Sequence, residues 1–186
     1  MKTIILVTCA LCGTAGCATR QPDHFYVLAA QPSDIRDSLP RNNLQAALRL
    51  TLPSLVDRNE MVLATPDGVA VMEHERWAAP LADLMATTLR QDIERRRGDV
   101  LISRWSADPG ISRVRIEVDI VQLSARRGSE VSIETQWRVT DAGHTSIGRE
   151  VFVAPVHSDS YAALASALST CVGLLADRLV KEFPPG

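Results

Sequence analysis

The chain has 186 residues, of which 46% are hydrophobic and 4% aromatic, and its formal net charge at pH 7 is −2. This length fits one domain with its own core, which must consist mainly of Leu, Val, Ile and Ala because aromatic residues are so few. The slightly acidic balance lacks the basic excess of a nucleic-acid-binding protein, so we expect no nucleic-acid partner.

The first 16 residues have the three regions of a secretory signal peptide. Lys2 supplies the positive charge, residues 3–11 form an apolar run, and residues 14–16 are small and directly precede Cys17. The apolar run is shorter than the roughly 20 apolar residues that a helix needs to span a bilayer, so we expect residues 1–16 to be cleaved.

Cys17 is the predicted lipidation site of a bacterial lipoprotein. The lipoprotein signal peptidase requires a cysteine directly after the cut, because the thiol carries the lipid, and Cys12 fits less well because Leu11 precedes it. Thr14 departs from the usual pattern, in which Leu lies three residues before the cysteine. The alternative is an ordinary secretory signal that leaves a free periplasmic thiol.

The residue after the cysteine predicts the destination of the lipoprotein. Ala18 stands where an Asp commonly retains such proteins in the inner membrane, so we expect sorting to the outer membrane. Stable attachment needs at least two acyl chains, which a lipoprotein cysteine carries.

Cleavage before Cys17 would leave 170 of the 186 residues (186 minus 16) and, with Lys2 lost, a formal charge of −3. Cys9 and Cys12 would leave with the signal, so Cys171 would be the single unmodified cysteine. A disulfide framework and a cysteine metal site are therefore excluded. We also expect no second segment that is apolar enough to cross a membrane.

Residues 17–24 are the lipidated N terminus and a short polar tether, which reaches at most about 24 Å when fully extended. Folded structure is predicted to begin with the strand-like run at residues 25–28. We therefore expect one domain over residues 25–186, held close to the membrane surface.

Residues 31–43 contain Pro and polar residues and predict a loop. Residues 44–52 alternate in hydrophobicity and are followed by Pro53, so we interpret them as a strand although their Ala and Leu content also suits a helix. Two apolar runs in residues 61–72 flank Pro-Asp-Gly at 66–68, which predicts a hairpin.

Residues 77–97 are predicted to form the first helix. Pro80 suits its first turn, basic residues 95–97 suit its last turn, and Gly98 would end it. One apolar face is expected to consist of Leu81, Leu84, Met85, Thr88, Leu89 and Ile93.

Four strands are predicted next, and the second and third alternate cleanly between apolar and polar residues. The strands cover residues 100–105, 114–120, 131–139 and 149–156, with turns at 126–128 and 141–144. Such alternation indicates an antiparallel sheet with one apolar and one polar face.

The last predicted helix begins near Asp159, with Ser158 or Asp159 as its cap, and ends before Pro184 and Pro185. Its apolar stripe is Tyr161, Leu164, Leu168, Cys171 or Val172, Leu175 and Leu179. We predict a two-layer α+β fold, a mainly antiparallel sheet with two long amphipathic helices packed on one face.

Residue patterns for catalysis or metal binding are weak. His24, His74, His144 and His157 are predicted on the tether, a strand end, a turn and a loop, and none has metal-ligand spacing. Glu73 and Glu75 flank His74 on a strand, where neighbouring side chains point to opposite faces. We find no phosphate-binding loop and no nucleophile elbow, and we expect neither an enzyme nor a cofactor other than the lipid on Cys17.

Five further residues have simple structural interpretations. Asp57 and Arg58 could form a weak loop salt bridge with each other. Trp77 and Trp137 are predicted packing anchors, and Cys171 on an apolar stripe is interpreted as a small core residue.

Several short segments occur together in a fixed order: Phe25–Leu28, Leu52–Arg58, Met61–Val62, Arg76–Leu81, Val131–Trp137 and Tyr161–Leu164. The ordered set resembles the auxiliary lipoprotein of MCE-type lipid transport systems, the PqiC or ABC-type transport auxiliary lipoprotein family. The positions that carry the resemblance are Tyr26, Pro53, Asp57, Arg58, Trp77, Pro80, Leu81, Trp137 and Tyr161. Asn59 and Glu60 depart from it, since a residue such as Pro or Gln is expected after Arg58.

The resemblance implies a non-enzymatic subunit for lipid trafficking and envelope integrity. Its implied partners are an MCE-domain periplasmic protein, which forms a hydrophobic conduit, and inner-membrane ABC or permease components. The lipoprotein would dock the conduit at the outer membrane, and a homo-oligomer is expected because the conduit is symmetric.

Two alternatives remain at this point. The first is an outer-membrane adaptor of another envelope machine, such as lipopolysaccharide assembly or cell-wall synthase activation. The second is a module that itself carries a lipid, which requires an apolar cavity of roughly 300–1,000 Å³.

Overall fold

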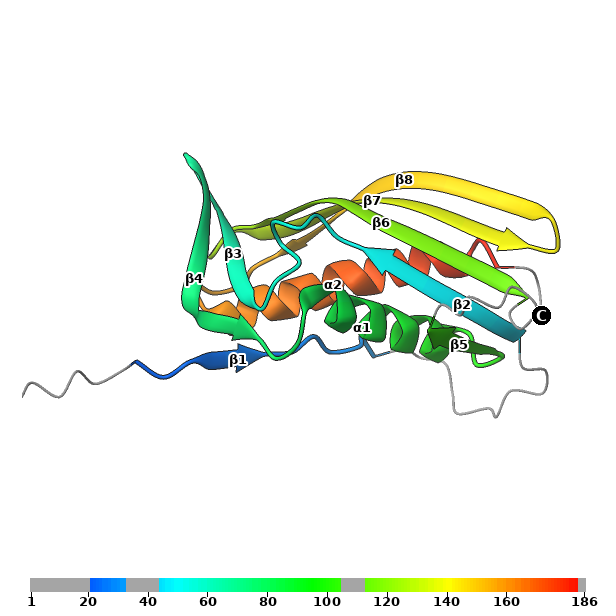
Figure 1. The fold of residues 1–186 in the computed structure, drawn as a ribbon, viewed down its shortest axis with the longest axis horizontal. Helices are drawn as coiled ribbons and strands as arrows, with labels where there is room; N and C mark the ends of the chain where they lie inside the picture. The colour runs from blue at the N-terminus through cyan, green and yellow to red at the C-terminus, as the bar shows by residue number, and fades with distance from the viewer. Residues whose placement is uncertain (1–20, 33–43, 105–112, 184–186) are drawn as a thin grey trace, which may run out of the picture.

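The structure is a computed structural model that describes residues 21–32, 44–104 and 113–183. Its elements are β1 (His24–Tyr26), β2 (Leu44–Thr51), β3 (Glu60–Thr65), β4 (Gly68–Trp77), α1 (Leu81–Arg96), β5 (Val100–Arg104), β6 (Val114–Ala125), β7 (Glu130–Asp141), β8 (His144–Pro155) and α2 (Tyr161–Val180). Figure 1 shows both helices along one side of the long sheet, with the β3–β4 hairpin projecting at one end. The predicted α+β class is confirmed.

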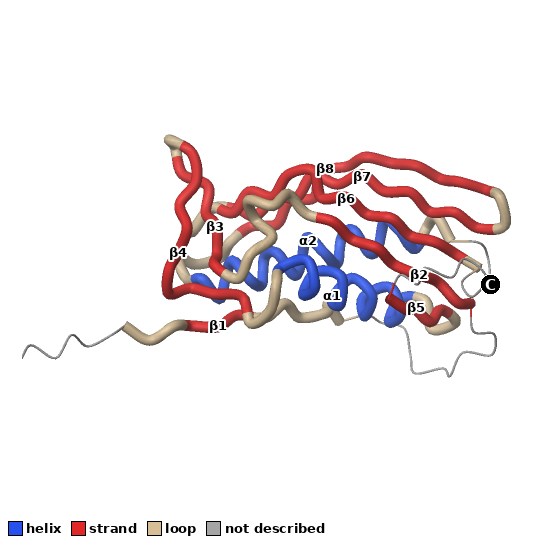
Figure 2. The backbone as a smooth tube through the Cα atoms, in the orientation of Figure 1, coloured by secondary structure: helices blue, strands red, loops and turns tan. Residues whose placement is uncertain are grey.

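The larger sheet has five strands in the order β5-β2-β6-β7-β8 (Figure 2). Strands β6, β7 and β8 form an antiparallel meander, as the alternation in β6 and β7 and the turns at 126–128 and 141–144 predict. The turn between β7 and β8 places Ala142 and Gly143 at φ values of 44° and 90°. Two consecutive positive φ values match a tight hairpin turn whose twist fits the flanking strands.

The strand assignment of residues 44–52 is confirmed, and β2 pairs in parallel with both β5 and β6. Parallel neighbours need long crossover connections, and here the β3–β4 hairpin and α1 lie between β2 and β5 in sequence. Within those intervening residues, β3 and β4 belong to a second sheet, which β1 completes in the order β1-β4-β3. The strands thus divide between two sheets.

Helix α2 is buried against β7 and β8 of the larger sheet. Cys171 on this helix is 0% exposed, and its thiol contacts the carbonyl oxygens of Val131 and Phe152 at 3.4 and 3.7 Å. The interpretation of Cys171 as a small core residue is confirmed, and burial raises the pKa of its thiol to about 12.

By length and composition α2 could cross a membrane, contrary to the expectation of no second such segment. More than half of its residues are buried inside the fold, including Leu164, Leu168, Val172, Leu175 and Leu179. A helix that is apolar on most sides is typical of a core helix as well as of a membrane span, and the packing against the sheet accounts for its composition.

Both helices begin later than predicted. Trp77 ends β4, and α1 starts at Leu81 after Pro80, because a proline disfavours the helical conformation in the residue before it. Helix α2 is capped by Ser160, whose Oγ accepts a hydrogen bond from the backbone N–H of Ala163 at 3.1 Å. The cap is therefore neither Ser158 nor Asp159.

The predicted hairpin around Pro66 and Asp67 is confirmed, since these two residues connect Thr65 to its pairing partner Gly68. Gly68 has a φ of +142°, which residues with a side chain rarely adopt. The predicted helix stop at Pro184 and Pro185 lies outside the described residues.

Gly148 on β8 is required by its neighbour Trp137, whose ring occupies the space above the glycine. A Cβ atom at position 148 would lie 2.1 Å from the ring atom Cζ2. We therefore expect Gly148→Ala to lower the free energy of unfolding by at least about 1–3 kcal/mol, because the buried ring must shift. Urea unfolding measures this, with the exposed Thr145→Ala on the same strand as a control. An unchanged midpoint for Gly148→Ala would contradict the packing.

Candidate functional site

Most of the segments that carry the sequence resemblance meet where the three-stranded sheet joins the starts of both helices. The backbone N–H of Trp77 donates to the carbonyl of Asn59 at 2.6 Å, and that of Ala78 donates to Tyr26 at 2.8 Å. The rings of Tyr26 and Tyr161 lie 6.4 Å apart. Residues from the N terminus, the middle and the last helix are thus brought into one cluster.

Tyr26 and Tyr161 form the polar side of this cluster. The Tyr26 hydroxyl donates to Glu75 Oε2 at 2.5 Å, and burial together with this hydrogen bond raises the pKa of Tyr26 to about 12. The guanidinium of Arg127 lies 4.6 Å from the centre of the Tyr161 ring and pairs with Asp159 at 2.9 Å. These contacts fix β1 and the β6–β7 turn against the start of α2.

Glu75 also receives a contact from His24, at 3.0 Å between Nδ1 and Oε1. Its partial burial raises the pKa of Glu75, but the hydrogen bonds from Tyr26 and His24 outweigh that effect and lower the pKa below the ordinary glutamate value. His74, the preceding residue, instead contacts Asp23 at 3.0 Å. The two neighbours on β4 therefore contact different residues, in β1 and directly before it, as alternating side chains should.

The loop after β2 supplies a hydrogen-bond acceptor to the first turn of α1. The carbonyl of Pro53 accepts the backbone N–H of Asp57 at 3.1 Å, and Asp57 Oδ1 accepts that of Ala82 at 3.2 Å. A side-chain acceptor is needed there because a proline at the cap position offers none. Arg58 pairs with Glu60 at 3.0 Å, so the predicted pairing between Asp57 and Arg58 is wrong.

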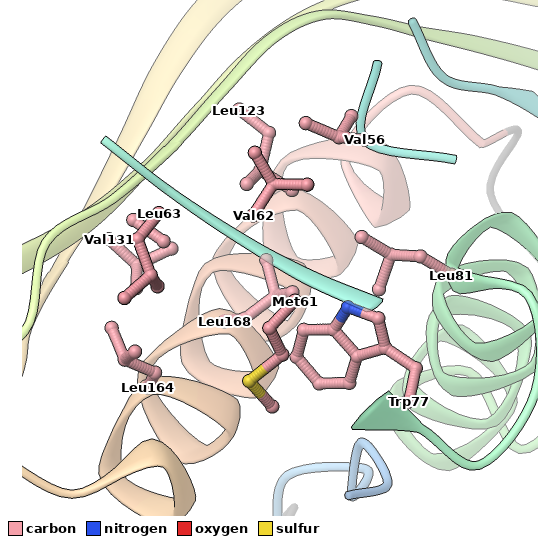
Figure 3. Close-up of a pocket in the computed structure, with 11 residues that line it drawn as sticks. Val56, Met61, Val62, Leu63, Trp77, Leu81, Leu123, Val131, Leu164 and Leu168 are labelled. Carbon is pink, nitrogen blue, oxygen red and sulfur yellow. The ribbon is translucent and has the colours of Figure 1, made fainter. Parts of the chain in front are cut away.

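An apolar cavity of about 20 Å³ lies beside Trp77 (Figure 3). It is lined by Val56, Met61, Val62, Leu63, Trp77, Leu81, Leu123, Ala125, Val131, Leu164 and Leu168. This volume is enough for about one water molecule and far too small for an acyl chain. A wider groove of about 450 Å³ between α1 and strands β2 and β5 includes Arg49, Asp83 and Arg90 in its lining, which does not suit a lipid tail.

The N-terminal segment (residues 24–32) continues from β1 across both helices (Figure 1). The backbone N–H of Ala29 donates to Ser169 Oγ on α2 at 3.1 Å, and that of Gln31 donates to Asp92 Oδ1 on α1 at 2.7 Å. Arg95 donates to the carbonyls of Ala30 and Gln31 at 3.0 and 3.3 Å. Side chains of both helices therefore hold the backbone that follows the predicted tether.

Asp92 is a buried carboxylate that the sequence analysis did not single out. It is 0% exposed, pairs with Arg96 at 3.0 Å, and leaves its Oδ2 without a hydrogen-bond partner. Burial raises the pKa of Asp92 although the hydrogen bonds from Gln31 and Arg96 oppose the effect. A signal was present, because Asp92 interrupts the apolar stripe between Leu89 and Ile93, and a buried charge requires partners.

Small residues on α2 make room for the N-terminal segment. Ala165, Ser169 and Gly173 are spaced by four residues, so they lie along one side of the helix. A Cβ at position 173 would lie 2.7 Å from Gln31 Cγ. A glycine inside a helix costs roughly 1 kcal/mol relative to alanine, and here it permits close approach of another chain segment.

Trp137 lies away from the cluster, toward the end of α2. It is buried, as predicted for a packing anchor, and the guanidinium of Arg178 lies 5.0 Å from its ring centre. Cys17 and Ala18 lie outside the described residues. Within residues 21–32, 44–104 and 113–183, no group of three His, Cys, Asp or Glu could hold a metal ion.

A family model described as ABC-type transport auxiliary lipoprotein component matches residues 26–180. A crystal structure of an uncharacterized protein shares the fold with a TM-score of 0.71 and 16% identity, covering 87% of this chain and 99% of its own. Protein XCC0632 from Xanthomonas campestris, assigned to DUF330, has a TM-score of 0.64 and 16% identity, covering 84% and 92%. No curated protein matches the chain.

We expect Asp92→Ala to loosen the N-terminal segment. Losing a charged acceptor costs about 1.5–3 kcal/mol. The backbone N–H of Gln31 would lose its acceptor, whereas that of Ala29 would keep its hydrogen bond to Ser169 Oγ. Hydrogen exchange should therefore accelerate at the Gln31 amide more than at Ala29, with the exposed Gln91→Ala as the control. Equal protection of Gln31 in both variants would contradict the role of Asp92.

The lowered pKa of Glu75 predicts a pH dependence of stability. The Glu75 carboxylate binds a proton more readily in the unfolded chain than in the folded protein. The stability that Glu75 contributes is therefore complete above the ordinary glutamate pKa of 4.5 and is lost as the pH falls through the lower pKa of the folded protein. Urea unfolding between about pH 3 and pH 7 should show that Glu75→Gln differs most from wild type at the upper end. Glu73→Gln, on the exposed side of β4, controls for the loss of one charge, and a constant difference across the range would contradict the prediction.

Proposed function

The chain belongs to the ABC-type transport auxiliary lipoprotein component family, and on this premise we propose that it is a non-enzymatic lipoprotein subunit of an MCE-type lipid transport system. It docks the periplasmic MCE conduit at the outer membrane and supports lipid trafficking and envelope integrity. The observation that carries the proposal is the family match over residues 26–180, nearly the whole predicted domain.

Cys17 carries the lipid in this proposal, and the geometry of the N-terminal segment supports it. Helices α1 and α2 hold residues 29–31 through Asp92, Arg95 and Ser169, and β1 begins at His24, seven residues after Cys17. The domain is therefore kept within a few tens of ångströms of its anchor. A component that docks a conduit at the membrane needs this closeness.

Self-association through the edge of the larger sheet is part of the proposal. Strand β8 is 12 residues long and is an edge strand of the described sheet, with β7 as its neighbour. Ile147, Val151 and Val153 are exposed on its face away from the helices. A long edge strand with exposed aliphatic side chains is a ready template for pairing with another copy, and a symmetric ring suits a tubular partner.

A pull-down from native membranes tests the proposal. The tagged chain would be purified in mild detergent, and the co-purifying proteins identified by mass spectrometry, beside a Cys17→Ser variant. We expect an MCE-domain protein with the wild-type chain, radiolabelled palmitate on the wild type alone, and release of Cys17→Ser from the outer-membrane fraction.

Two outcomes would contradict the proposal in different ways. Recovery of other outer-membrane machinery without an MCE protein, in cells that express one, would favour a general adaptor. Palmitate labelling and outer-membrane fractionation that are unchanged in Cys17→Ser would contradict the anchor itself, whatever partner is recovered.

A further inference from the structure

We propose that the outward side of the N-terminal segment, formed by Phe25, Val27 and Ala29, lies in the surface of the bilayer that holds the anchor. The inference rests on the proposed lipidation of Cys17. It adds a membrane-contacting surface to the domain and an orientation relative to the membrane.

The N-terminal segment is apolar on both of its sides. Tyr26 and Leu28 face inward and pack against the core, whereas Phe25 is 65% and Val27 62% exposed. Ala29 continues the exposed side in the same alternation. A strand-like segment with two apolar sides is normally covered on both, and within the described residues only the inner side is covered.

Phe25 cannot reach the core by turning the segment over. The backbone carbonyl of Tyr26 accepts from Ala78, and β1 pairs with β4 in a fixed parallel register, with Phe25 opposite Arg76. Farther along, Ala29 and Gln31 are held by Ser169 and by Asp92. Rotating Phe25 inward would break these hydrogen bonds and expose Tyr26 and Leu28. The outward row of Phe25, Val27 and Ala29, called the stripe below, is therefore a fixed feature of the fold.

The stripe faces away from the larger sheet. Ser169 on α2 contacts the N-terminal segment, whereas Cys171 contacts β7 and β8. Two residues along a helix differ by about 200° around its axis, so the two contacts lie on nearly opposite sides of α2. The helices thus lie between the N-terminal segment and the larger sheet, as Figure 1 shows.

A bilayer fits this stripe better than a protein partner does. Three side chains in a single row cannot supply the roughly 800 Å² per partner of a stable protein interface. Phe25 is eight residues from Cys17, a reach of at most about 27 Å. The anchor keeps the bilayer at a high effective concentration, so a small apolar surface with an exposed Phe is enough to engage it.

The test uses the full-length lipidated chain reconstituted in vesicles of phosphatidylethanolamine and phosphatidylglycerol. A fluorescent NBD label is attached to Val27→Cys or, as a control, to Ile147→Cys, which is 68% exposed on the far side of the sheet. Buried Cys171 does not compete for the label. Brominated lipids then report contact with the bilayer by quenching the label.

We expect quenching at position 27 and none at position 147. Adding Phe25→Ser should shift the equilibrium between protein whose stripe contacts the bilayer and anchored protein whose stripe does not. The ratio of the first to the second, measured by quenching at position 27, should fall about tenfold because the largest side chain of the stripe is lost. The added Val69→Ser, at an exposed apolar position on the β3–β4 hairpin, is the matched control and should leave quenching unchanged.

The other outcomes separate this inference from the proposed anchor. Protein that floats with the vesicles but has an unquenched label at position 27 would contradict the contact between the stripe and the bilayer and leave the anchor standing. If such a label is instead shielded from soluble iodide, and unlabelled Val27→Cys chains form a disulfide with each other under an added oxidant, the stripe is an interface between copies. Protein that does not float would contradict the anchor and, with it, the membrane stripe.

Discussion

The attachment of the N-terminal segment to the helices is the constraint on which the rest of the molecule depends. It rests on a buried charge, because Asp92 accepts the backbone N–H of Gln31 and is balanced by Arg96. A buried carboxylate is costly unless it is paired and hydrogen-bonded, so its presence on an apolar helix face implies a specific geometry. That geometry gives the chain leaving the domain one fixed path across α1 and α2.

Local patterns predicted the elements well, because period-two alternation and turn residues depend on near neighbours. The meander of β6, β7 and β8 and the hairpin at Pro66 follow from such patterns. The parallel pairing of β2 and the division into two sheets depend on contacts between distant residues, which alternation does not report. Trp77 ends β4, but an apolar residue shortly before Pro80 suits either a helix start or a strand end, so the local sequence does not decide between them.

The candidate site likewise combines features that near neighbours in the sequence reveal with features that depend on contacts between distant residues. The resemblance identified Tyr26, Trp77 and Tyr161 in their sequence order, yet only the fold brings them together at one junction. Asp92 interrupts the apolar stripe of α1, but a single charge in a periodic pattern does not identify its partner on a distant segment. Gly173 was also missed, since a helical glycine reveals its purpose only when a second segment crosses the helix at that point.

The two sides of the N-terminal segment connect the fold to the proposed function. Its inner side fixes the helices relative to the proposed anchor, and its outer side, with Phe25 and Val27, is exposed. In the proposed orientation, with the outer side on the membrane, the helices form the layer nearer the bilayer. The face of the larger sheet that points away from the helices is then directed into the periplasm. The long β8 edge and its aliphatic face are then directed where other copies and a periplasmic conduit can reach them.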